Sequence, residues 1–301
     1  MTMRWLIVSL SSKKADLEGI KNLVYSHGAE VCEFNIDSEY SLDFFKAVAD
    51  CEYCVWLDKT MPFSRSASAE TAYSVGYLIG KDVPFFCVCD TPDKKVHLSS
   101  DNCQFFSSAT QLEKILSEKF PEFLEREKQK HARQALLEAG IPFNPDSFAF
   151  HIAADNKDEC NLFIDAGIDV NSLDAAGTPM LCVAARHNRK LMIEKLLDLG
   201  ADINAVSKDR GYSPVMDAVW KSNAEIVEYL VKKGANLSYI SRDGQPVLVL
   251  AVGTGNEQIC RMLVDNGADP SVCDSMGMSA LAYAKLFKKT ALIPLFEAYT
   301  K

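Results

Sequence analysis

The sequence lacks several features that would place it in a particular functional class. No apolar run in its 301 residues reaches the roughly 18 residues of a membrane-spanning helix, so we expect no membrane partner. The apolar run Leu6–Leu10 is too short for the core of a signal peptide, and a buried first strand explains it better. Positive charge is in deficit, with a formal net charge of −9, which disfavours binding to a nucleic-acid backbone.

Disulfide, metal and phosphate-binding motifs are also missing. The ten cysteines are scattered, several of them within apolar segments, which indicates reduced thiols in a core and a cytoplasmic location. Cys51 and Cys54 have the spacing of a metal-binding pair. No second pair or histidine cluster accompanies them in the sequence, so we predict core packing and no metal. Because there is no glycine-rich phosphate loop either, we predict no cofactor.

The sequence does contain a repeat, which extends over roughly residues 167–279. One marker is a Gly-Ala-Asp-like triplet, which begins at Gly167, Gly200, Gly234 and Gly267. A second marker is a glycine followed closely by Pro or Ser, which occurs at Gly177, Gly211, Gly244 and Gly277. The spacings are 33, 34 and 33 residues for the first marker and 34, 33 and 33 for the second. Two independent markers with one period predict a solenoid of repeated helical units.

Residues 141–301 closely resemble an ankyrin-repeat array of four to five repeats, with atypical repeats at both ends. The resemblance implies an all-α solenoid of short antiparallel helices, with projecting turns and a concave face that binds a protein partner. The candidate partner-binding positions are Arg186, His187, Asp209, Arg210, Tyr212, Trp220, Lys221, Arg242 and Asp243. Trp, Tyr and Arg are the residue types enriched in binding hot spots. The alternative for Trp220 is that it packs between helices.

The first 110 residues alternate between apolar runs and segments with helical spacing. The predicted strands are Trp5–Leu10, Glu30–Phe34, Tyr53–Leu57, Pro84–Cys89 and, less regularly, Cys103–Phe106. The predicted helices between them are Asp16–His27, Leu42–Val48 and Ala69–Ile79. This rhythm predicts a doubly wound parallel sheet of the flavodoxin or Rossmann type, whose ligands bind beyond the carboxyl ends of the strands.

The segment from Ser66 to Lys81, SASAETAYSVGYLIGK, follows a strand that ends in Leu57-Asp58 and precedes Val83-Pro84-Phe85. With these flanks it resembles the nucleoside 2-deoxyribosyltransferase-like superfamily, and TIR-like domains share a comparable layout. The resemblance covers roughly residues 4–90. It implies binding of a nucleoside, nucleotide or NAD, with a helix glutamate acting at the anomeric carbon while an N-glycosidic bond breaks.

This chain departs from the family pattern at the glutamate, because Ser74 occupies that position and Glu70 is the one carboxylate of the helix. Glu70 could catalyse from one turn earlier, with Asp58 raising its pKa by like-charge repulsion. The site could instead bind a ligand without catalysis. A third interpretation makes Glu70 a stabiliser of the helix dipole, with Ser66 or Ser68 as N-cap. The candidate ligand-binding residues are Ser9, Ser11, Ser68, Thr71 and Ser74.

Residues 111–140 connect the two predicted domains. An apolar stripe from Leu112 to Phe120 is interrupted by Pro121, and we predict a helix over Glu122–Ala139 that joins the domains and caps the array. The sequence as a whole favours protein recognition by the array, fused to a nucleoside-binding α/β domain. The alternative is an N-glycosidase or deoxyribosyltransferase that the array directs to its target.

Overall fold

The computed structural model describes residues 3–9, 16–35, 41–58, 68–89 and 102–299. The chain divides into two compact units, Met1–Glu127 and Lys128–Lys301, and each is described by itself. The first unit is α/β, and the described part of the second consists of helices joined by turns, with isolated β-bridges. Among the helices of these described ranges, none has the length and apolar character needed to cross a lipid bilayer.

The N-terminal unit contains a five-stranded parallel sheet in its described part. The strands are β1 (Arg4–Ser9), β2 (Glu30–Asn35), β3 (Tyr53–Leu57), β4 (Phe85–Val88) and β5 (Cys103–Phe106), in the spatial order β2-β1-β3-β4-β5. All four neighbouring pairs are parallel. The central strands β1 and β3 are buried almost throughout, which explains their continuous apolar sequences, whereas the edge strand β2 is largely exposed.

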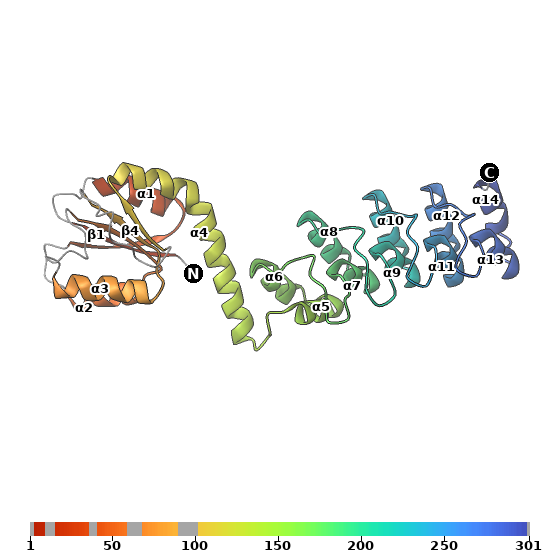
Figure 1. Cartoon of the computed structure of the whole chain (residues 1–301), viewed down its shortest axis with the longest axis horizontal. Coiled ribbons are helices and arrows are strands. Elements are labelled where there is room, and N and C mark those ends of the chain that lie inside the picture. Colours follow the sequence, from red (N-terminus) through yellow and green to blue (C-terminus); the bar gives the residue numbers. More distant parts are fainter. Residues whose placement is uncertain (1–2, 10–15, 36–40, 59–67, 90–101, 300–301) are drawn as a thin grey trace. The chain divides into compact units, whose positions relative to one another are not determined.

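Helices cover both faces of this sheet, as the sequence pattern predicts (Figure 1). One face carries α1 (Glu18–Ser26) and the first half of α4 (Ala109–Glu138), and its core includes stacked aromatic rings. The ring centroid of Trp5 lies 4.7 Å from that of Tyr53 and 5.7 Å from that of Phe120. The other face carries α2 (Leu42–Asp50) and α3 (Ala69–Gly80), and its core holds both Cys51 and Cys54 as predicted.

Helix α4 is longer than the sequence suggested. The interruption predicted at Pro121 is wrong, because α4 runs unbroken through it from Ala109 to Glu138. Proline removes one backbone hydrogen bond and strains the helix by roughly 3 kcal/mol. Packing outweighs this cost, since Leu116 and Phe120 on the preceding turns are fully buried against the sheet. The apolar stripe therefore fixes the helix before the proline, and Phe123, which packs against the same core, continues the contact after it.

The C-terminal unit contains five successive helix pairs in the described residues. They are α5 (Pro145–Ala154) with α6 (Lys157–Asp165), α7 (Met180–Arg186) with α8 (Lys190–Asp198), α9 (Pro214–Trp220) with α10 (Ala224–Lys232), α11 (Val247–Thr254) with α12 (Glu257–Asp265), and α13 (Ala280–Leu286) with α14 (Leu292–Tyr299). Figure 1 shows these pairs stacked in register. One continuous core joins them, and it begins with Ala132 and Leu136 from the end of α4.

Polar side chains link the turns of neighbouring repeats at fixed intervals. The Oδ1 atom of Asn171 accepts a hydrogen bond from the backbone N–H of Asp202, and Asn204 does the same for Asn236 one repeat later. Several turns are also closed by an isolated antiparallel bridge, such as that between Leu173 and Pro179. Each repeat therefore depends on the next for both its core and its turn geometry, which is the expected behaviour of a solenoid.

Candidate functional site

The carboxyl edge of the sheet is the first candidate site, because the strand order reverses there between β1 and β3. Ser9 ends β1 and is buried, and Asp58 follows β3 beside it, with Leu57 paired to Ser9. The predicted ligand-binding residue Ser11 lies outside the described residues, as do residues 59–67 and 90–101. Two of the predicted residues thus meet at the switch point of the sheet.

Glu70 lies in the first turn of α3 and is solvent-exposed. Ser68 is the N-cap of this helix, as predicted, because its hydroxyl accepts a hydrogen bond from the backbone N–H of Thr71 at 3.2 Å. The pKa of Glu70 is lowered by its own backbone N–H and by the Ser68 hydroxyl. The predicted rise in this pKa is therefore wrong, because hydrogen bonds at the helix start stabilise the charged form and Asp58 contributes no repulsion.

A cavity of about 570 Å³ lies beside Glu70. It is lined by Phe45, Val48, Ala49, Ala69, Glu70, Tyr73 and Tyr77, from α2 and α3. The aromatic rings lie in contact, with centroid distances of 6.0 Å between Phe45 and Tyr73 and 6.3 Å between Tyr73 and Tyr77. Neither Ser9 nor Asp58 lines this cavity, so the described residues do not bring Glu70 into the same pocket as the switch point.

Thr71 and Ser74 face the interior of the unit. Both are buried, and Ser74 is fully inaccessible on the helix face that carries Val75 and Leu78. Among the described residues, the Ser74 hydroxyl has no hydrogen-bond partner. Position 74, at which the resemblance led us to look for a glutamate, thus holds a small buried side chain, and the exposed face of α3 carries the one carboxylate, Glu70.

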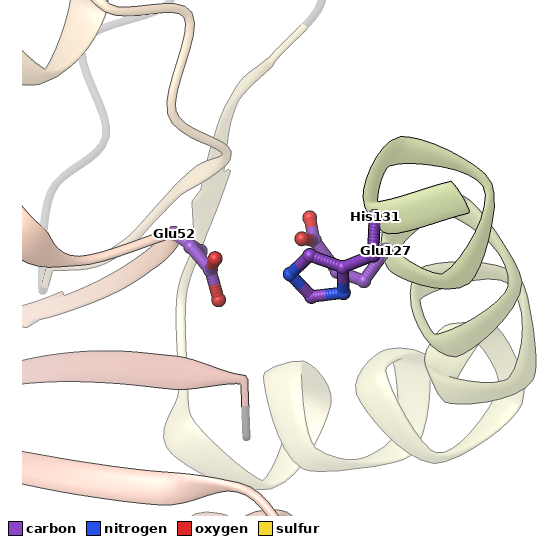
Figure 2. A group of neighbouring side chains, drawn as sticks. All are labelled: Glu52, Glu127 and His131. Carbon is purple, nitrogen blue, oxygen red and sulfur yellow. The ribbon is translucent and has the colours of Figure 1, made fainter. Parts of the chain in front are cut away.

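Three side chains of the types that bind metal ions lie near the start of β3. Figure 2 shows Glu52, with Glu127 and His131 one turn apart on α4, and one potential ligand atom of each lies within 4.8 Å of the others. Both carboxylates already have partners. The backbone N–H of Arg4 donates to Glu52 at 3.1 Å, and the Tyr53 hydroxyl donates to Glu127 at 3.3 Å. These hydrogen bonds explain the group without an ion, and we assign no metal to it.

The array has a charged cluster at its centre, on α7, α9 and the turn between repeats. The carboxylate of Asp217, on α9, is fully buried and accepts two hydrogen bonds from the Arg186 guanidinium, at 2.9 Å and 3.3 Å. Asp209 lies 3.8 Å from the same guanidinium. Burial acts to raise the pKa of Asp209, but hydrogen bonds from Ser207 and the Arg210 backbone, with the charge of Arg186, lower it overall. Arg186 therefore neutralises both acids.

Next to this cluster, Arg210, Trp220 and Lys221 form what we call the Trp220 patch. The guanidinium carbon of Arg210 lies 4.1 Å from the Trp220 ring centroid, and the Lys221 ammonium lies 4.3 Å from it. The Trp220 side chain is 37% exposed, whereas Trp5 and Trp56 are fully buried. Trp220 is therefore a surface residue, and the interpretation that it is core between helices is wrong.

The remaining predicted partner-binding residues divide into surface and core. Tyr212 is buried, with 8% exposure, and its hydroxyl pairs with Gln245 of the next repeat at 3.4 Å. Its predicted role as a surface anchor is wrong, because the turn folds its ring into the junction between repeats. Arg242 and Asp243 are exposed in the next turn, and His187 is exposed at the end of α7.

Sequence analysis missed Asp217, the residue that organises the charged cluster. The available signal was a single acid within the apolar segment Pro214–Val219, at a place where neighbouring repeats have apolar residues. A buried carboxylate requires a partner. That partner is Arg186, 31 positions earlier and one repeat away, so only the stacking of repeats identifies it.

Comparisons with known proteins identify the repeats. The family model described as ankyrin repeats (3 copies) matches residues 150–241 and 216–295. A "Putative ankyrin repeat-containing protein" of Treponema pallidum is 39% identical over 173 residues, which is 58% of this chain and 58% of that protein. "Ankyrin repeat and SOCS box protein 6" of Homo sapiens is 30% identical over 152 residues, covering 42% of this chain and 36% of that protein. The C-terminal part of the chain is therefore an ankyrin-repeat region. The chain spans 58% of the length of the bacterial relative and 36% of the length of the human one.

Proposed function

We propose that the chain recognises a protein partner through its ankyrin repeats, with the Trp220 patch at the centre of the contact. Ankyrin repeats usually bind proteins, and the patch supplies an exposed aromatic ring with cations on it. Residues of this type dominate the binding energy of protein interfaces. The observation that carries the proposal is the exposure of Trp220 in a chain whose other two tryptophans are fully buried.

The test is affinity capture with the full-length protein, followed by identification of cross-linked partners. We expect Trp220→Ala to reduce recovery of the partner at least tenfold, as truncation of a hot-spot residue costs roughly 2 kcal/mol or more. The matched control is Leu191→Ala, since Leu191 is an exposed apolar residue on the second helix of a repeat. Equal recovery with wild type and Trp220→Ala would contradict the proposed contact.

For the N-terminal unit we propose binding of a small molecule of the nucleoside or nucleotide class at the carboxyl edge of the sheet. The strand order with its switch point between β1 and β3, and the position of Ser9 and Asp58 there, support this proposal. Catalysis by Glu70 is the alternative. Its lowered pKa keeps the carboxylate charged, as a nucleophile or cation stabiliser requires, but its cavity has aromatic and aliphatic walls.

One assay separates binding from catalysis in this unit. Wild type and Glu70→Gln are incubated with deoxynucleosides, their monophosphates and NAD, and both the melting temperature of the protein and the release of the free base are measured. We expect ligand-dependent thermal stabilisation in both proteins and no base release from either, because Ser74 cannot replace the family's glutamate. Base release by wild type that Glu70→Gln abolishes would establish the enzymatic alternative instead.

A further inference from the structure

We propose that the Trp220 patch binds an acidic segment of the partner, with side-chain carboxylates seated against Arg210 and Lys221. The proposal rests on the protein-recognition role proposed above and adds the chemical class of the partner. Four observations lead to it: how Arg210 is held, what the nearby acids do, how His187 titrates, and the charge of the whole chain.

Arg210 is held with its hydrogen-bonding edge unused. A guanidinium that stacks on an aromatic ring uses its face, and its N–H donors remain in the plane of the group. Within the described residues, the Arg210 side chain makes no hydrogen bond or ion pair and has ring contacts with Trp220 and Tyr212, at 4.1 Å and 5.9 Å. Contact with the two rings also restricts the side chain, so Arg210 has less conformational freedom to lose on binding. The side chain is thus preorganised for a planar, bidentate anion such as a carboxylate.

The acids that could neutralise the patch have other partners. Asp217 and Asp209 are both paired with Arg186. In the described part of the chain, no carboxylate lies within 4.0 Å of the charged groups of Arg210 or Lys221. Asp243 in the next turn is exposed and acts on Tyr212 only through space. Arg210 and Lys221 therefore converge on one ring, and neither has a direct ion-pair partner among the described residues. The charge of Arg210 acts on Asp209 and Asp217 through space, but both carboxylates contact Arg186.

The pKa of the neighbouring His187 is sensitive to the positive charges at this surface. Burial is the first cause that lowers the pKa of His187, and the charges of Arg189, Arg186 and Lys221 lower it further. A bound carboxylate beside Lys221 would oppose this effect. A change in the pKa of His187 would therefore show that a ligand binds next to Lys221, which a binding constant alone does not show.

The negative net charge of the chain limits where on its surface an acidic ligand can bind. With a formal net charge of −9, the protein repels acidic peptides in general, so an acidic ligand that binds must find a local positive site. Aromatic side chains of the ligand could add contact with the free part of the Trp220 ring. The patch consequently fits a carboxylate-rich segment and excludes a basic one.

The test uses the full-length protein and three labelled ten-residue probes: oligoglutamate, oligolysine and a neutral Gly-Ser peptide. Binding is followed by fluorescence anisotropy at about 50 mM and about 300 mM salt, because ionic contacts at a surface weaken with screening. We expect oligoglutamate to bind at the Trp220 patch, more weakly at the higher salt, and to raise the pKa of His187 measured by NMR. Oligolysine, which the net charge of −9 attracts to other parts of the surface, should not raise this pKa.

Charge reversal provides the critical comparison. The double variant Arg210→Glu/Lys221→Glu should weaken oligoglutamate binding at least tenfold. Lys233→Glu is the matched control, because Lys233, at the C-cap of α10 in the same repeat, also lies over an aromatic ring, that of Tyr229 at 5.6 Å. The neutral pair Arg210→Gln/Lys221→Gln should give an intermediate loss, and circular dichroism checks that each variant is folded.

Several outcomes would overturn the proposal: no binding of oligoglutamate by wild type, an equal rise in the pKa of His187 with oligolysine, unchanged oligoglutamate binding by the double variant, or an equal loss in Lys233→Glu. Affinity capture distinguishes this failure from failure of the wider function. A partner whose recovery depends on Trp220 but survives charge reversal would leave protein recognition standing and remove the acidic class alone. Absence of any Trp220-dependent partner would remove both.

Discussion

The ion pair between Arg186 and Asp217 joins two repeats through a partly buried guanidinium and a fully buried carboxylate. Its two hydrogen bonds, at 2.9 Å and 3.3 Å, have the bidentate geometry that a buried carboxylate needs. Burial raises the pKa of Asp217, and Arg186 opposes the rise without cancelling it. A raised carboxyl pKa means that the folded state holds this proton more tightly than the unfolded state. The contribution of Asp217 to stability therefore falls as pH rises through its folded pKa.

The variant Arg186→Met tests how the stability contributed by Asp217 depends on pH. The buried Asp217 carboxylate would lose its partner, and we expect a loss of about 3–5 kcal/mol in the free energy of unfolding at neutral to alkaline pH. The loss should shrink toward acidic pH, because Asp217 then takes up a proton and is no longer a buried charge. Urea unfolding followed by circular dichroism at a series of pH values measures both effects.

Lys190→Met is the control for this experiment, since Lys190 pairs with Glu225 at 2.6 Å on the surface. Exposed pairs contribute roughly 0–1 kcal/mol, so this variant should remain close to wild type at every pH. A loss in Arg186→Met that does not change with pH would show that packing, and not the charge of Asp217, accounts for it.

At the scale of the element, α4 is the part of the fold that contradicts local sequence rules. Pro121 is exposed in the middle of a 30-residue helix. Leu112, Leu116 and Phe120 precede it along the buried stripe, so burial of this stripe maintains the helix. Roughly 1.5–3 kcal/mol of stabilisation accompanies full burial of each large apolar side chain, and several such residues together exceed the cost of one proline.

Pro121→Ala should therefore stabilise the N-terminal unit. Alanine restores the hydrogen bond from position 121 to the carbonyl of Ser117 and removes the ring clash, while the freer unfolded chain offsets part of the gain. We expect an increase of about 1–2 kcal/mol in the free energy of unfolding. Emission from Trp5 and Trp56, both buried in this unit, follows its unfolding in urea.

Glu122→Ala, at the exposed neighbouring position, serves as the comparison and should change stability by less than about 0.5 kcal/mol. Destabilisation by Pro121→Ala would show that the helix requires a bend at this position.

For the whole molecule, the stacked repeats supply their own core, so the array should fold without the sheet. In the structure, the core of the array includes residues before position 141, so a fragment with the complete array must begin earlier in the chain. Ala132 and Leu136 of α4 belong to the core of the array, and Arg133 donates a hydrogen bond to the carbonyl of Ala166 at 3.0 Å. These contacts cover the apolar surface of the first repeat.

Two fragments test this boundary. Residues 128–301 should give a helical circular dichroism spectrum and a cooperative thermal transition. Residues 141–301 should also be helical but melt at a lower temperature, because loss of Leu136 alone removes roughly 1.5–3 kcal/mol of burial. A random-coil spectrum for residues 128–301 would mean that the array needs the N-terminal unit, and equal melting temperatures would mean that α4 does not cap it.

The sequence alone determined the features that depend on local pattern. Glycines at a fixed period specify helix pairs, since Gly211 and its equivalents adopt positive φ angles that other residues avoid. At Gly211 an added Cβ would also approach the backbone nitrogen of Arg242 to 2.5 Å. Continuous apolar runs such as Tyr53–Leu57 specify buried parallel strands for a similarly local reason. Ser68 as N-cap belongs to the same group.

Tertiary structure decided every feature that depends on residues far apart in the chain. The helix through Pro121, the burial of Tyr212 and the pairing of Asp217 with Arg186 each depend on packing between separate elements. The place of Glu70 beside an aromatic cavity that neither Ser9 nor Asp58 lines depends on how α3 packs beside α2. Sequence spacing specifies which face of a helix a residue occupies, but the element that covers that face is fixed only when the chain has folded.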